Sequence, residues 1–432
     1  MAGVPISRRA VLRFLGLGVA ALGARGFPAI AGGDGGHVVV VGGGFGGATA
    51  ARYIRRFDPS IRVTLVEPRA RFYTCPFSNL YLAGLRSFDK LGHGYDALRR
   101  VHGVDVVPAW VEDVDTVARH VRLRDGSRLA YDRLLLSPGV DMDWQALEGY
   151  DAAASEHAPH AWKAGSQSHR LRRQLEAMDD GGVFILSAPA NPYRCPPGPY
   201  ERVSLIAHFL KRHKPRSKIL LLDAKDGFSK QPLFMEGWQA LYGGMIEWVG
   251  LSADGRVLRV DARRREVETE FGARHRAAVL NVVPPQKAGL IAHRAGVTDR
   301  SGWVPVKPET FESRQVDNVY VVGDATVAAP MPKSAFCANS QARMAAAAIV
   351  ASLQNRAPPE PVWANTCYSL LAPEYGISVA GVYRLIDGEI AEVPNSGGIS
   401  PLEAGSDFRA REARYAQRWY ASICDDTWGP RG

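Results

Sequence analysis

The chain has 432 residues, of which 46% are hydrophobic and 22% charged. This is enough to bury two or three cores and excludes a disordered or fibrous protein. The formal net charge is +9, but the excess arginine is scattered in short runs and no nucleic-acid recognition module is present, so we expect no nucleic-acid partner. No stretch of about 20 apolar residues after the N-terminal segment predicts a membrane span.

The N-terminus resembles an export signal. Arg8 and Arg9 open a basic segment, and residues 14–24 form an apolar run too short to span a bilayer. Small residues within 24–33 offer a cleavage site. Paired arginines before a weakly apolar run are typical of twin-arginine signals. We therefore interpret residues 1–33 as a signal region and expect a periplasmic mature protein. A cytoplasmic protein with an incidental basic start is the alternative.

A glycine-rich turn follows the first predicted strand. Residues 37–41 are a β-branched run, as a buried parallel strand requires, and Gly-Gly-Gly-Phe-Gly-Gly comes next. Gly42, Gly44 and Gly47 occupy the three positions of a dinucleotide fingerprint, which allow a tight turn, close approach to a pyrophosphate and close helix packing. Residues 48–57 predict the helix whose N-terminus faces the phosphates.

An acidic residue completes this dinucleotide site. Residues 61–66 predict a second strand that ends at Glu67, which comes 20 residues after Gly47. An acid at this spacing can bind a ribose hydroxyl. A glycine turn that arose by chance is the weaker alternative, because the strand, helix and acid are all in register.

Residues near the C-terminus indicate which dinucleotide binds. Residues 319–323 predict a buried strand that leads into Asp324, ahead of the alanine-rich helical run 342–353. With Gly323 before the acid, this order resembles the flavin-binding signature of two-dinucleotide flavoproteins, in which the aspartate contacts the ribityl chain. Gly139 ends a Leu-Leu-Leu-Ser-Pro-Gly run that is similar to that family's connecting motif. The resemblance implies FAD; a helix N-cap is the alternative role for Asp324.

A proline-framed cysteine stands where such an enzyme carries its second glycine fingerprint. Residues 183–199 run from a predicted strand into Arg-Cys-Pro-Pro-Gly-Pro, and they lack a phosphate-binding glycine turn. We therefore expect a thiol site in place of a nicotinamide site. No CxxC or His-rich spacing predicts a metal site. The five cysteines, an odd number in a chain expected to be exported, are Cys75, Cys195, Cys337, Cys367 and Cys424.

Six further segments make a family resemblance specific. In order along nearly the whole mature chain, they are similar to the flavoprotein subunit of flavocytochrome c sulfide dehydrogenase. The segments are residues 72–79, 157–163, 194–202, 331–334, 338–341 and 365–369. The resemblance implies an α/β fold with two Rossmann-like domains of the glutathione-reductase type and a C-terminal interface domain.

The same resemblance implies roles for individual residues. It places a covalent bond from Cys75 to the 8-methyl carbon of FAD, and a redox disulfide between Cys195 and Cys367 beside the flavin. Glu201 matches the acid or base that moves a proton, and Lys333 is expected to stabilise the anionic reduced ring. The alternatives are a buried, inert Cys75, a purely structural disulfide, and a solvated or N-capping Glu201. The resemblance gives no role to the other two cysteines.

The activity implied is oxidation of hydrogen sulfide to sulfur or polysulfide. Hydrosulfide attacks the disulfide, and two electrons pass to the flavin. The chain contains no CxxCH haem site, so the acceptor implied is a separate c-type cytochrome subunit, expected to carry two haems. The rival interpretations are a sulfide:quinone reductase, an NADH-dependent disulfide reductase and a non-catalytic electron-transfer subunit.

The domain boundaries follow from these motifs and from a proline-rich run at 356–361. After the signal we expect a FAD domain in two parts, 36–150 and 279–356, a middle domain at 151–278 and a C-terminal domain at 357–432. The last domain contains a predicted helix at 407–424, with Phe408, Tyr415, Trp419 and Ile423 on a face that packs in the core. Its many arginines disfavour an apolar membrane anchor.

Overall fold

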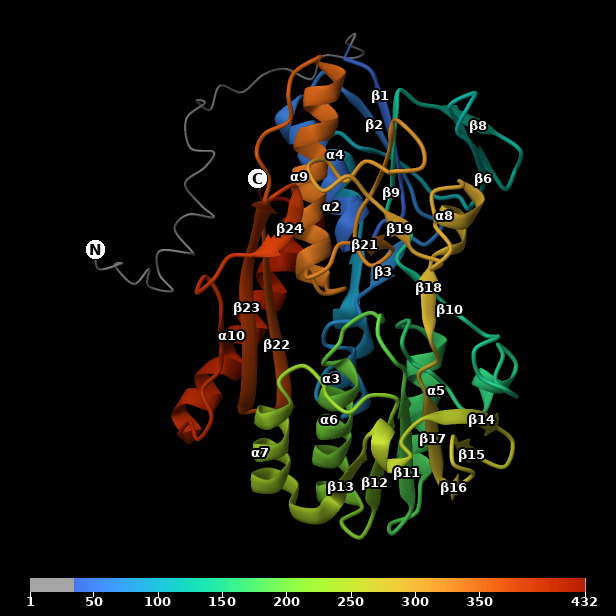
Figure 1. The fold of residues 1–432 in the computed structure, drawn as a ribbon, viewed down its shortest axis with the longest axis vertical. Coiled ribbons are helices and arrows are strands. Elements are labelled where there is room, and N and C mark those ends of the chain that lie inside the picture. The colour runs from blue at the N-terminus through green and yellow to red at the C-terminus, as the bar shows by residue number, and fades with distance from the viewer. Residues whose placement is uncertain (1–34, 432) are drawn as a thin grey trace.

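The computed structural model describes residues 35–431, so the predicted signal at 1–33 lies outside the described residues. The protein consists of two α/β domains with a long antiparallel sheet along one side of both (Figure 1). The two Rossmann-like domains and the C-terminal domain predicted from the sequence are confirmed. None of the described helices is both long and apolar enough to cross a bilayer.

The first domain is built on a five-stranded parallel sheet. Its strands, in spatial order, are β20 (Val319–Val321), β9 (Arg133–Leu136), β1 (His37–Val41), β2 (Arg62–Val66) and β5 (Asp105–Val107). Two helices, α2 (Phe45–Phe57) and α9 (Ala335–Leu353), pack against each other beside it. Four of the five β1 residues are buried, as the β-branched run predicted. Helix α9 begins seven residues before the predicted run, where Ser334 Oγ accepts a hydrogen bond from Cys337 N at 3.0 Å.

Smaller elements complete this domain. They are an antiparallel sheet of β6 (Val111–Asp115), β7 (His120–Leu123) and β8 (Arg128–Ala130), the strand pairs β3 (Arg71–Tyr73) with β4 (Gly92–Gly94) and β19 (Val304–Pro305) with β21 (Thr326–Val327), and the helices α3 (Ser78–Leu82), α4 (Asp96–Arg100) and α8 (Leu290–Arg294).

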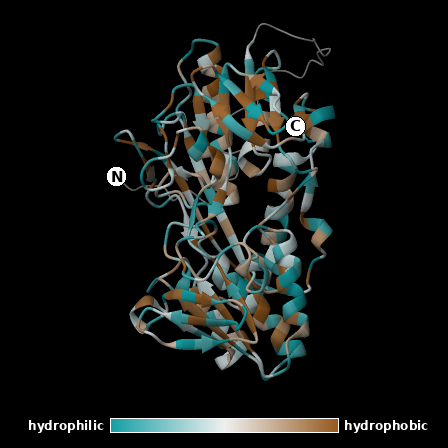
Figure 2. Ribbon diagram, turned by 90° about the vertical axis from the view of Figure 1, so that its right-hand side faces the viewer, coloured by the Kyte–Doolittle hydropathy of each residue, from teal (hydrophilic) through white to brown (hydrophobic). Residues whose placement is uncertain are grey.

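The middle domain has a second parallel sheet. Its order is β13 (Ile246–Val249), β12 (Lys218–Asp223), β11 (Val183–Ala188) and β17 (Val279–Val282), with helices α5 (Ser166–Ala177), α6 (Gly198–His213) and α7 (Gln231–Tyr242). A small antiparallel sheet of β14 (Val257–Asp261), β15 (Glu266–Thr269) and β16 (Arg274–Arg276) adjoins it. Hydrophobic segments gather in the strands of both parallel sheets (Figure 2).

The boundary expected after residue 278 needs correction. Strand β17 pairs in parallel with β11, so the middle sheet continues to Val282. The chain then returns to the first domain through β18 (Gln286–Ala288), which pairs antiparallel with β10 (Val140–Met142). The two crossings between the domains therefore lie side by side as one two-stranded ribbon.

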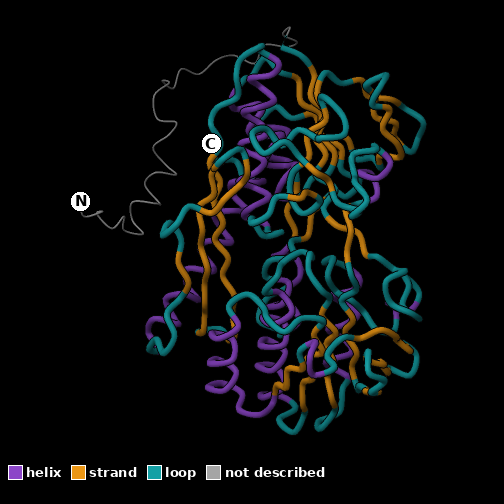
Figure 3. The backbone as a smooth tube through the Cα atoms, viewed as in Figure 1, coloured by secondary structure: helices purple, strands orange, loops and turns teal. Residues whose placement is uncertain are grey.

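The C-terminal domain spans the other two. Strands β22 (Val362–Ala372), β23 (Tyr375–Ile386), β24 (Glu389–Glu392) and β25 (Gly398–Ile399) form its sheet (Figure 3). Strand β22 packs against α6 of the middle domain and α9 of the first, and helix α10 (Ser406–Trp428) packs against α2 and β23. The predicted helix is confirmed, and of its predicted core face Ile423 is buried and Phe408 and Trp419 are half-buried, whereas Tyr415 is exposed. Arg409 and Glu412 are also buried, the first ion-paired with Glu236 and the second hydrogen-bonded to Ser400.

Candidate active site

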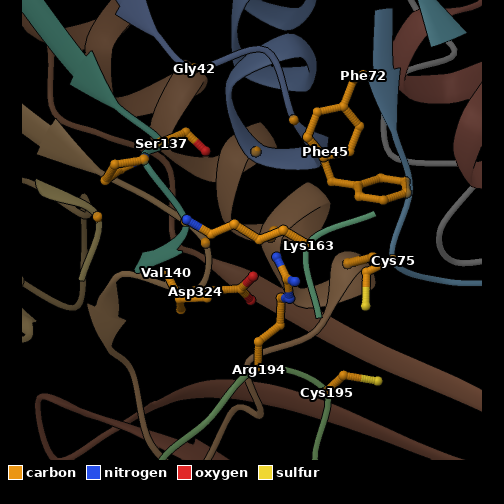
Figure 4. Close-up of a pocket in the computed structure, with 18 of the residues that line it drawn as sticks. Gly42, Phe45, Phe72, Cys75, Ser137, Val140, Lys163, Arg194, Cys195 and Asp324 are labelled. Carbon is orange, nitrogen blue, oxygen red and sulfur yellow. The ribbon is translucent and has the colours of Figure 1, made fainter. Parts of the chain in front are cut away.

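A cavity of about 490 Å³ extends from the glycine turn after β1 to the middle of β22. It brings together residues from all three domains. Those that the sequence analysis singled out and that line it are Gly42, Gly44, Glu67, Cys75, Gly139, Cys195, Glu201, Gly323, Asp324 and Cys367. Figure 4 shows Gly42, Cys75, Cys195 and Asp324 around this space. Of the predicted site residues, Gly47 and Lys333 are not part of the lining.

The glycine turn is shaped to receive a phosphate group. Gly42 has a φ of 99°, and a Cβ there would lie 2.4 Å from the carbonyl oxygen of Ser137. A Cβ on Gly47 would lie 1.9 Å from the carbonyl oxygen of Gly42, so this glycine allows α2 to pack against the turn and has no place in the lining. Glu67 Oε2 accepts a hydrogen bond from Gly43 N at 2.9 Å, which holds the acid at the edge of the cradle.

Asp324 indicates that a polar group belongs in the cavity. The side chain is half-buried, and its buried Oδ1 has no hydrogen-bond partner within residues 35–431. Burial raises the pKa of Asp324, against the lowering influence of Arg194 and then Lys333. A buried oxygen without a partner is costly unless a ligand supplies a donor. The hydroxyls of a ribityl chain are such donors, so the glycine cradle and Asp324 together fit FAD.

Lys333 lies next to Asp324 but outside the lining of this cavity. Its ammonium donates hydrogen bonds to the carbonyl oxygens of Asp324 and Thr326 at 2.8 and 2.7 Å, and sits 3.8 Å from the centre of the Trp303 ring. Burial lowers its pKa to about 8. The lysine therefore holds the loop after β20. The cations that line the cavity include Lys163, which is ion-paired with Asp141, and Arg194, whose charge acts on Asp324.

Cys75 and Cys195 lie in contact, although 120 residues separate them in the sequence. The Cys195 thiol donates a hydrogen bond to the Cys75 sulfur, and this bond lowers the pKa of Cys75 to about 6; Arg194 and Arg202 contribute in the same direction. Figure 4 shows both sulfurs on the same side of the cavity. A thiolate is the nucleophilic form of cysteine, so the site favours reaction at Cys75.

The position of the Cys195 sulfur is fixed by its backbone. Its φ of 62° is in the left-handed region, which non-glycine residues rarely adopt outside constrained sites. Its N–H donates to the Lys333 carbonyl at 2.8 Å, and its own carbonyl accepts from Gly198 N at 2.7 Å. A Cβ on Gly198 would lie 3.1 Å from the Cys195 sulfur and 2.7 Å from the Trp162 ring, so only glycine fits at this first residue of α6.

Cys367 reaches the same cavity from β22. The structure describes Cys195 and Cys367 as free thiols, so their disulfide stays a prediction. Lys230 lies beside Cys367, with its Nζ 4.0 Å from Sγ. Burial raises the pKa of Cys367; Lys230 opposes that shift and Glu201 adds to it. The other two cysteines, Cys337 and Cys424, are buried outside this cavity.

Glu201 faces the thiols with both oxygens hydrogen-bonded. Oε1 accepts from Leu370 N at 2.9 Å, and Oε2 accepts from Asn79 Nδ2 at 2.8 Å. Desolvation nevertheless raises its pKa, so Glu201 holds a proton to higher pH than an ordinary carboxyl group. This favours the acid–base role over a solvated carboxylate.

A buried arginine stands behind Glu201. Arg202 donates to Asn79 Oδ1 and Asn281 Oδ1 at 3.0 Å each, to the carbonyl oxygens of His160 and Ala161 at 2.8 and 2.7 Å, and stacks on Trp162. No carboxylate forms an ion pair with it in the described part of the chain. Burial lowers its pKa to about 10, which leaves it charged at neutral pH.

Sequence reasoning missed five residues described here: Asn79, Lys163, Arg194, Arg202 and Lys230. The first four lie inside segments that carried the family resemblance, so the resemblance was the signal that could have pointed to them. Lys230 lies in none, and only the approach of α7 to β22 reveals it.

The nucleotide crevice of the middle domain is filled by side chains. Asp223 ends β12, where a ribose-binding acid would stand, and its Oδ2 accepts from Tyr200 Oη at 2.6 Å and from Trp248 Nε1 at 3.1 Å. Lys225 forms an ion pair with its Oδ1. Phe228 stacks on Tyr200 with ring centres 3.5 Å apart. This acid is therefore committed to protein contacts.

The fold and the cavity define a flavoprotein of the disulfide oxidoreductase class. The family model of the pyridine nucleotide-disulphide oxidoreductases matches residues 36–176. Two more specific models also match: the central domain of the sulfide dehydrogenase (flavocytochrome c) flavoprotein chain at residues 168–284, and the flavin-binding domain of flavocytochrome c sulphide dehydrogenase at residues 359–428.

Individual relatives agree. The flavoprotein chain of sulfide dehydrogenase (flavocytochrome c) from Chlorobaculum thiosulfatiphilum is 74% identical over 43 residues, which are 90% of that sequence and 10% of this chain. The mitochondrial sulfide:quinone oxidoreductase of Dictyostelium discoideum is 25% identical over 319 residues, covering 71% of this chain and 68% of the relative. This chain spans about two thirds of the mitochondrial relatives that it matches. It belongs to the flavocytochrome c sulfide dehydrogenase flavoprotein family.

Solved structures share the fold. The sulfide:quinone oxidoreductase of Aquifex aeolicus superposes with a TM-score of 0.69 at 18% identity, covering 90% of this chain and 92% of that one. Putidaredoxin reductase, in its covalent complex with putidaredoxin, gives a TM-score of 0.63 at 17% identity, covering 90% and 93%. The family makes the chain a flavin-dependent oxidoreductase of the sulfide-oxidising type.

Proposed function

We propose that this protein oxidises hydrogen sulfide through a Cys195–Cys367 disulfide beside a FAD bound covalently to Cys75. One observation carries the proposal: three cysteines and the half-buried carboxyl group of Glu201 line the same cavity as the glycine turn that fits a dinucleotide. A buried structural disulfide needs neither the cradle nor the acid. The filled crevice at Asp223 supports a reductant other than NADH.

Hydrosulfide is a soft nucleophile, and a disulfide is its natural target. In the first step a bond forms between the sulfur of HS⁻ and one cysteine sulfur, the disulfide bond breaks, and a persulfide and a thiolate result. Over one cycle HS⁻ loses two electrons and one proton and leaves as zero-valent sulfur, free or as polysulfide, and the disulfide re-forms. The bound flavin supplies a two-electron acceptor.

The residues around the disulfide control charge and protons. Glu201, with its raised pKa, holds a proton within the cavity and can exchange it with the sulfur species. Arg202 and the N-terminus of α6, which begins three residues after Cys195, place positive potential behind the anionic sulfur. Gly198 keeps the space that the Cys195 sulfur needs.

Covalent attachment of FAD through Cys75 is supported by the lowered pKa of that thiol. The hydrogen bond from Cys195 gives Cys75 thiolate character at neutral pH, as a nucleophile requires. Its place in the lining of the cradle puts the sulfur within the space that the cofactor is expected to fill.

The electrons are proposed to leave through a c-type cytochrome subunit with two haems, in the periplasm after twin-arginine export. The family name, which couples the flavoprotein chain to a flavocytochrome c, supports the acceptor. A quinone is the second candidate, because the mitochondrial relatives are sulfide:quinone oxidoreductases. The arginines Arg411, Arg414 and Arg418 on the exposed face of α10 give that helix a polar surface, unlike an apolar membrane anchor.

Acceptor assays on the purified, FAD-loaded protein test this proposal. Sulfide added without oxygen should bleach the flavin absorbance, and adding oxidised cytochrome c should restore the flavin colour with reduction of the haem. A short-chain quinone should do so much more slowly. Bleaching followed by reoxidation only with quinone would favour the second candidate, and no bleaching by sulfide would refute the proposed activity.

A further inference from the structure

A buried lysine touches Cys367 and has no part in the chemistry described so far. Lys230 immediately precedes helix α7 and has a left-handed backbone with a φ of 63°. The residue is only 5% exposed. Its Nζ donates to Ser369 Oγ at 2.9 Å and to the Cys367 carbonyl at 3.3 Å, and lies 4.0 Å from Cys367 Sγ.

The charge of this lysine has no carboxylate partner in residues 35–431. The other buried lysine of the domain, Lys225, is ion-paired with Asp223. Glu201 is the carboxyl group that faces the same cavity, but its oxygens bond to Asn79 and Leu370. Burying an ammonium group among neutral acceptors is costly, and buried charges are as a rule paired. The one contacting atom of Lys230 that can become an anion is the Cys367 sulfur.

We propose that Lys230 is a further catalytic residue, whose ammonium group balances the negative charge that the Cys367 sulfur carries as thiolate or perthiolate during turnover. The inference rests on the proposed function, because sulfide oxidation is the reaction in which the Cys367 sulfur becomes negatively charged. Its geometry is independent, because the contact between Nζ and Sγ exists in the free protein. The hydroxyl of Ser369 and the Cys367 carbonyl hold the ammonium in place before any charge develops, as preorganised electrostatic stabilisation requires.

The groups facing Cys367 act in opposite directions. Burial is the largest effect and destabilises the Cys367 thiolate. Lys230, which precedes α7, stabilises the thiolate, and Glu201 on α6 destabilises it further. The thiols of Cys195 and Cys337 are the remaining titratable neighbours. An opposite charge within about 4–6 Å lowers a pKa by about one to three units. Without Lys230, the pKa of Cys367 should therefore rise by one unit or more.

The test uses the FAD-loaded protein after its dithiols have been reduced. Iodoacetamide is added over a range of pH, and mass spectrometry follows alkylation of the peptide that contains Cys367. Lys230→Gln removes the charge but keeps a donor for Ser369, whereas Lys230→Arg keeps the charge. Lys214→Gln is the matched control, because Lys214 also donates to backbone carbonyls but faces no thiol.

We expect Lys230→Gln to shift the midpoint of Cys367 alkylation upward by at least about one pH unit, which is about tenfold less thiolate at neutral pH. Lys230→Arg and Lys214→Gln should stay near wild type. An unchanged midpoint in Lys230→Gln overturns the proposal, as does loss of folding in both Lys230 variants, which would make the residue structural. The alkylation needs no sulfide, so a failure of the proposed function appears separately, as wild-type flavin that sulfide cannot bleach.

Discussion

The contact between Cys195 and Cys75 leads to a quantitative prediction about flavin attachment. The hydrogen bond from Cys195 is the main cause that lowers the pKa of Cys75 from 9.0 to about 6, with smaller contributions from Arg194 and Arg202. We take the variant Cys195→Ala, which removes the donor, and assume that the Cys75 pKa returns to 9.0. Cys195→Ser is the matched control, because its hydroxyl can still donate.

The magnitude follows from two opposing effects. At pH 6 about half of Cys75 is thiolate in the wild type and about one part in 1,000 in Cys195→Ala, a ratio of about 500. A thiolate of lower pKa is less nucleophilic, by about 20-fold over three units at a Brønsted slope of about 0.45. Attachment in Cys195→Ala should therefore be about 25-fold slower at pH 6. At pH 9 Cys75 is almost all thiolate in the wild type and about half thiolate in Cys195→Ala, so the thiolate fractions differ only about twofold. The higher nucleophilicity of the variant thiolate then dominates, and attachment in Cys195→Ala should be about tenfold faster than in the wild type.

The assay adds FAD to flavin-free protein in which Cys195 and Cys367 have been reduced to thiols, so that Cys195 can donate its hydrogen bond. It then follows the flavin that stays with the protein after acid precipitation. The predicted rates of wild type and Cys195→Ala cross between about pH 7 and 8, whereas Cys195→Ser should follow the wild type. A variant that is slower by the same factor at every pH would refute the role of the hydrogen bond. Flavin released entirely by acid from the wild type would refute covalent attachment itself.

Two further predictions concern specificity and protons. NADH and NADPH should leave the flavin oxidised in the absence of sulfide. The reason is that Asp223, the acid that would bind a nicotinamide ribose, is already bonded to Tyr200, Lys225 and Trp248. Rapid bleaching of the flavin by either nucleotide would show that a nicotinamide binds. At a fixed hydrosulfide concentration, flavin reduction should fall as the pH rises through the raised pKa of Glu201, because the protonated carboxyl is lost. Glu201→Gln should flatten this profile and slow reduction by about 10²–10⁴-fold; an unchanged profile would remove Glu201 from the mechanism.

The sequence predicted those parts of the molecule that local patterns determine. The run 37–41, the glycines after it and Glu67 lie where their spacing predicted, because a buried strand, a tight turn and a helix each have a residue signature. Cys195, in the loop between β11 and α6, was found by the same logic, because the segment departs from a glycine fingerprint. These are features of neighbouring residues.

Long-range packing determined what the sequence could not predict. Lys333 was expected at the cofactor, but its ammonium is captured by two carbonyls and Trp303. The predicted core-facing side of α10 was wrong at Tyr415, which is exposed. Contacts with α2 and β23 determine which side of this helix is buried, and periodicity alone does not reveal those contacts. Lys230 reaches Cys367 only because α7 packs on β22, 137 residues further along the chain. No local pattern encodes such a contact.

The most direct test of the central claim is stopped-flow flavin absorbance after sulfide is mixed with folded, FAD-loaded Cys195→Ser and Cys367→Ser. The account predicts that each variant abolishes reduction, and that the double variant loses no more than either single one, because the two sulfurs act as one unit. Cys337→Ser and Cys424→Ser, which change thiols buried outside the cavity, should keep most of the activity. Wild-type reduction rates in either Cys195→Ser or Cys367→Ser would contradict the account and leave the pair, at most, a structural role.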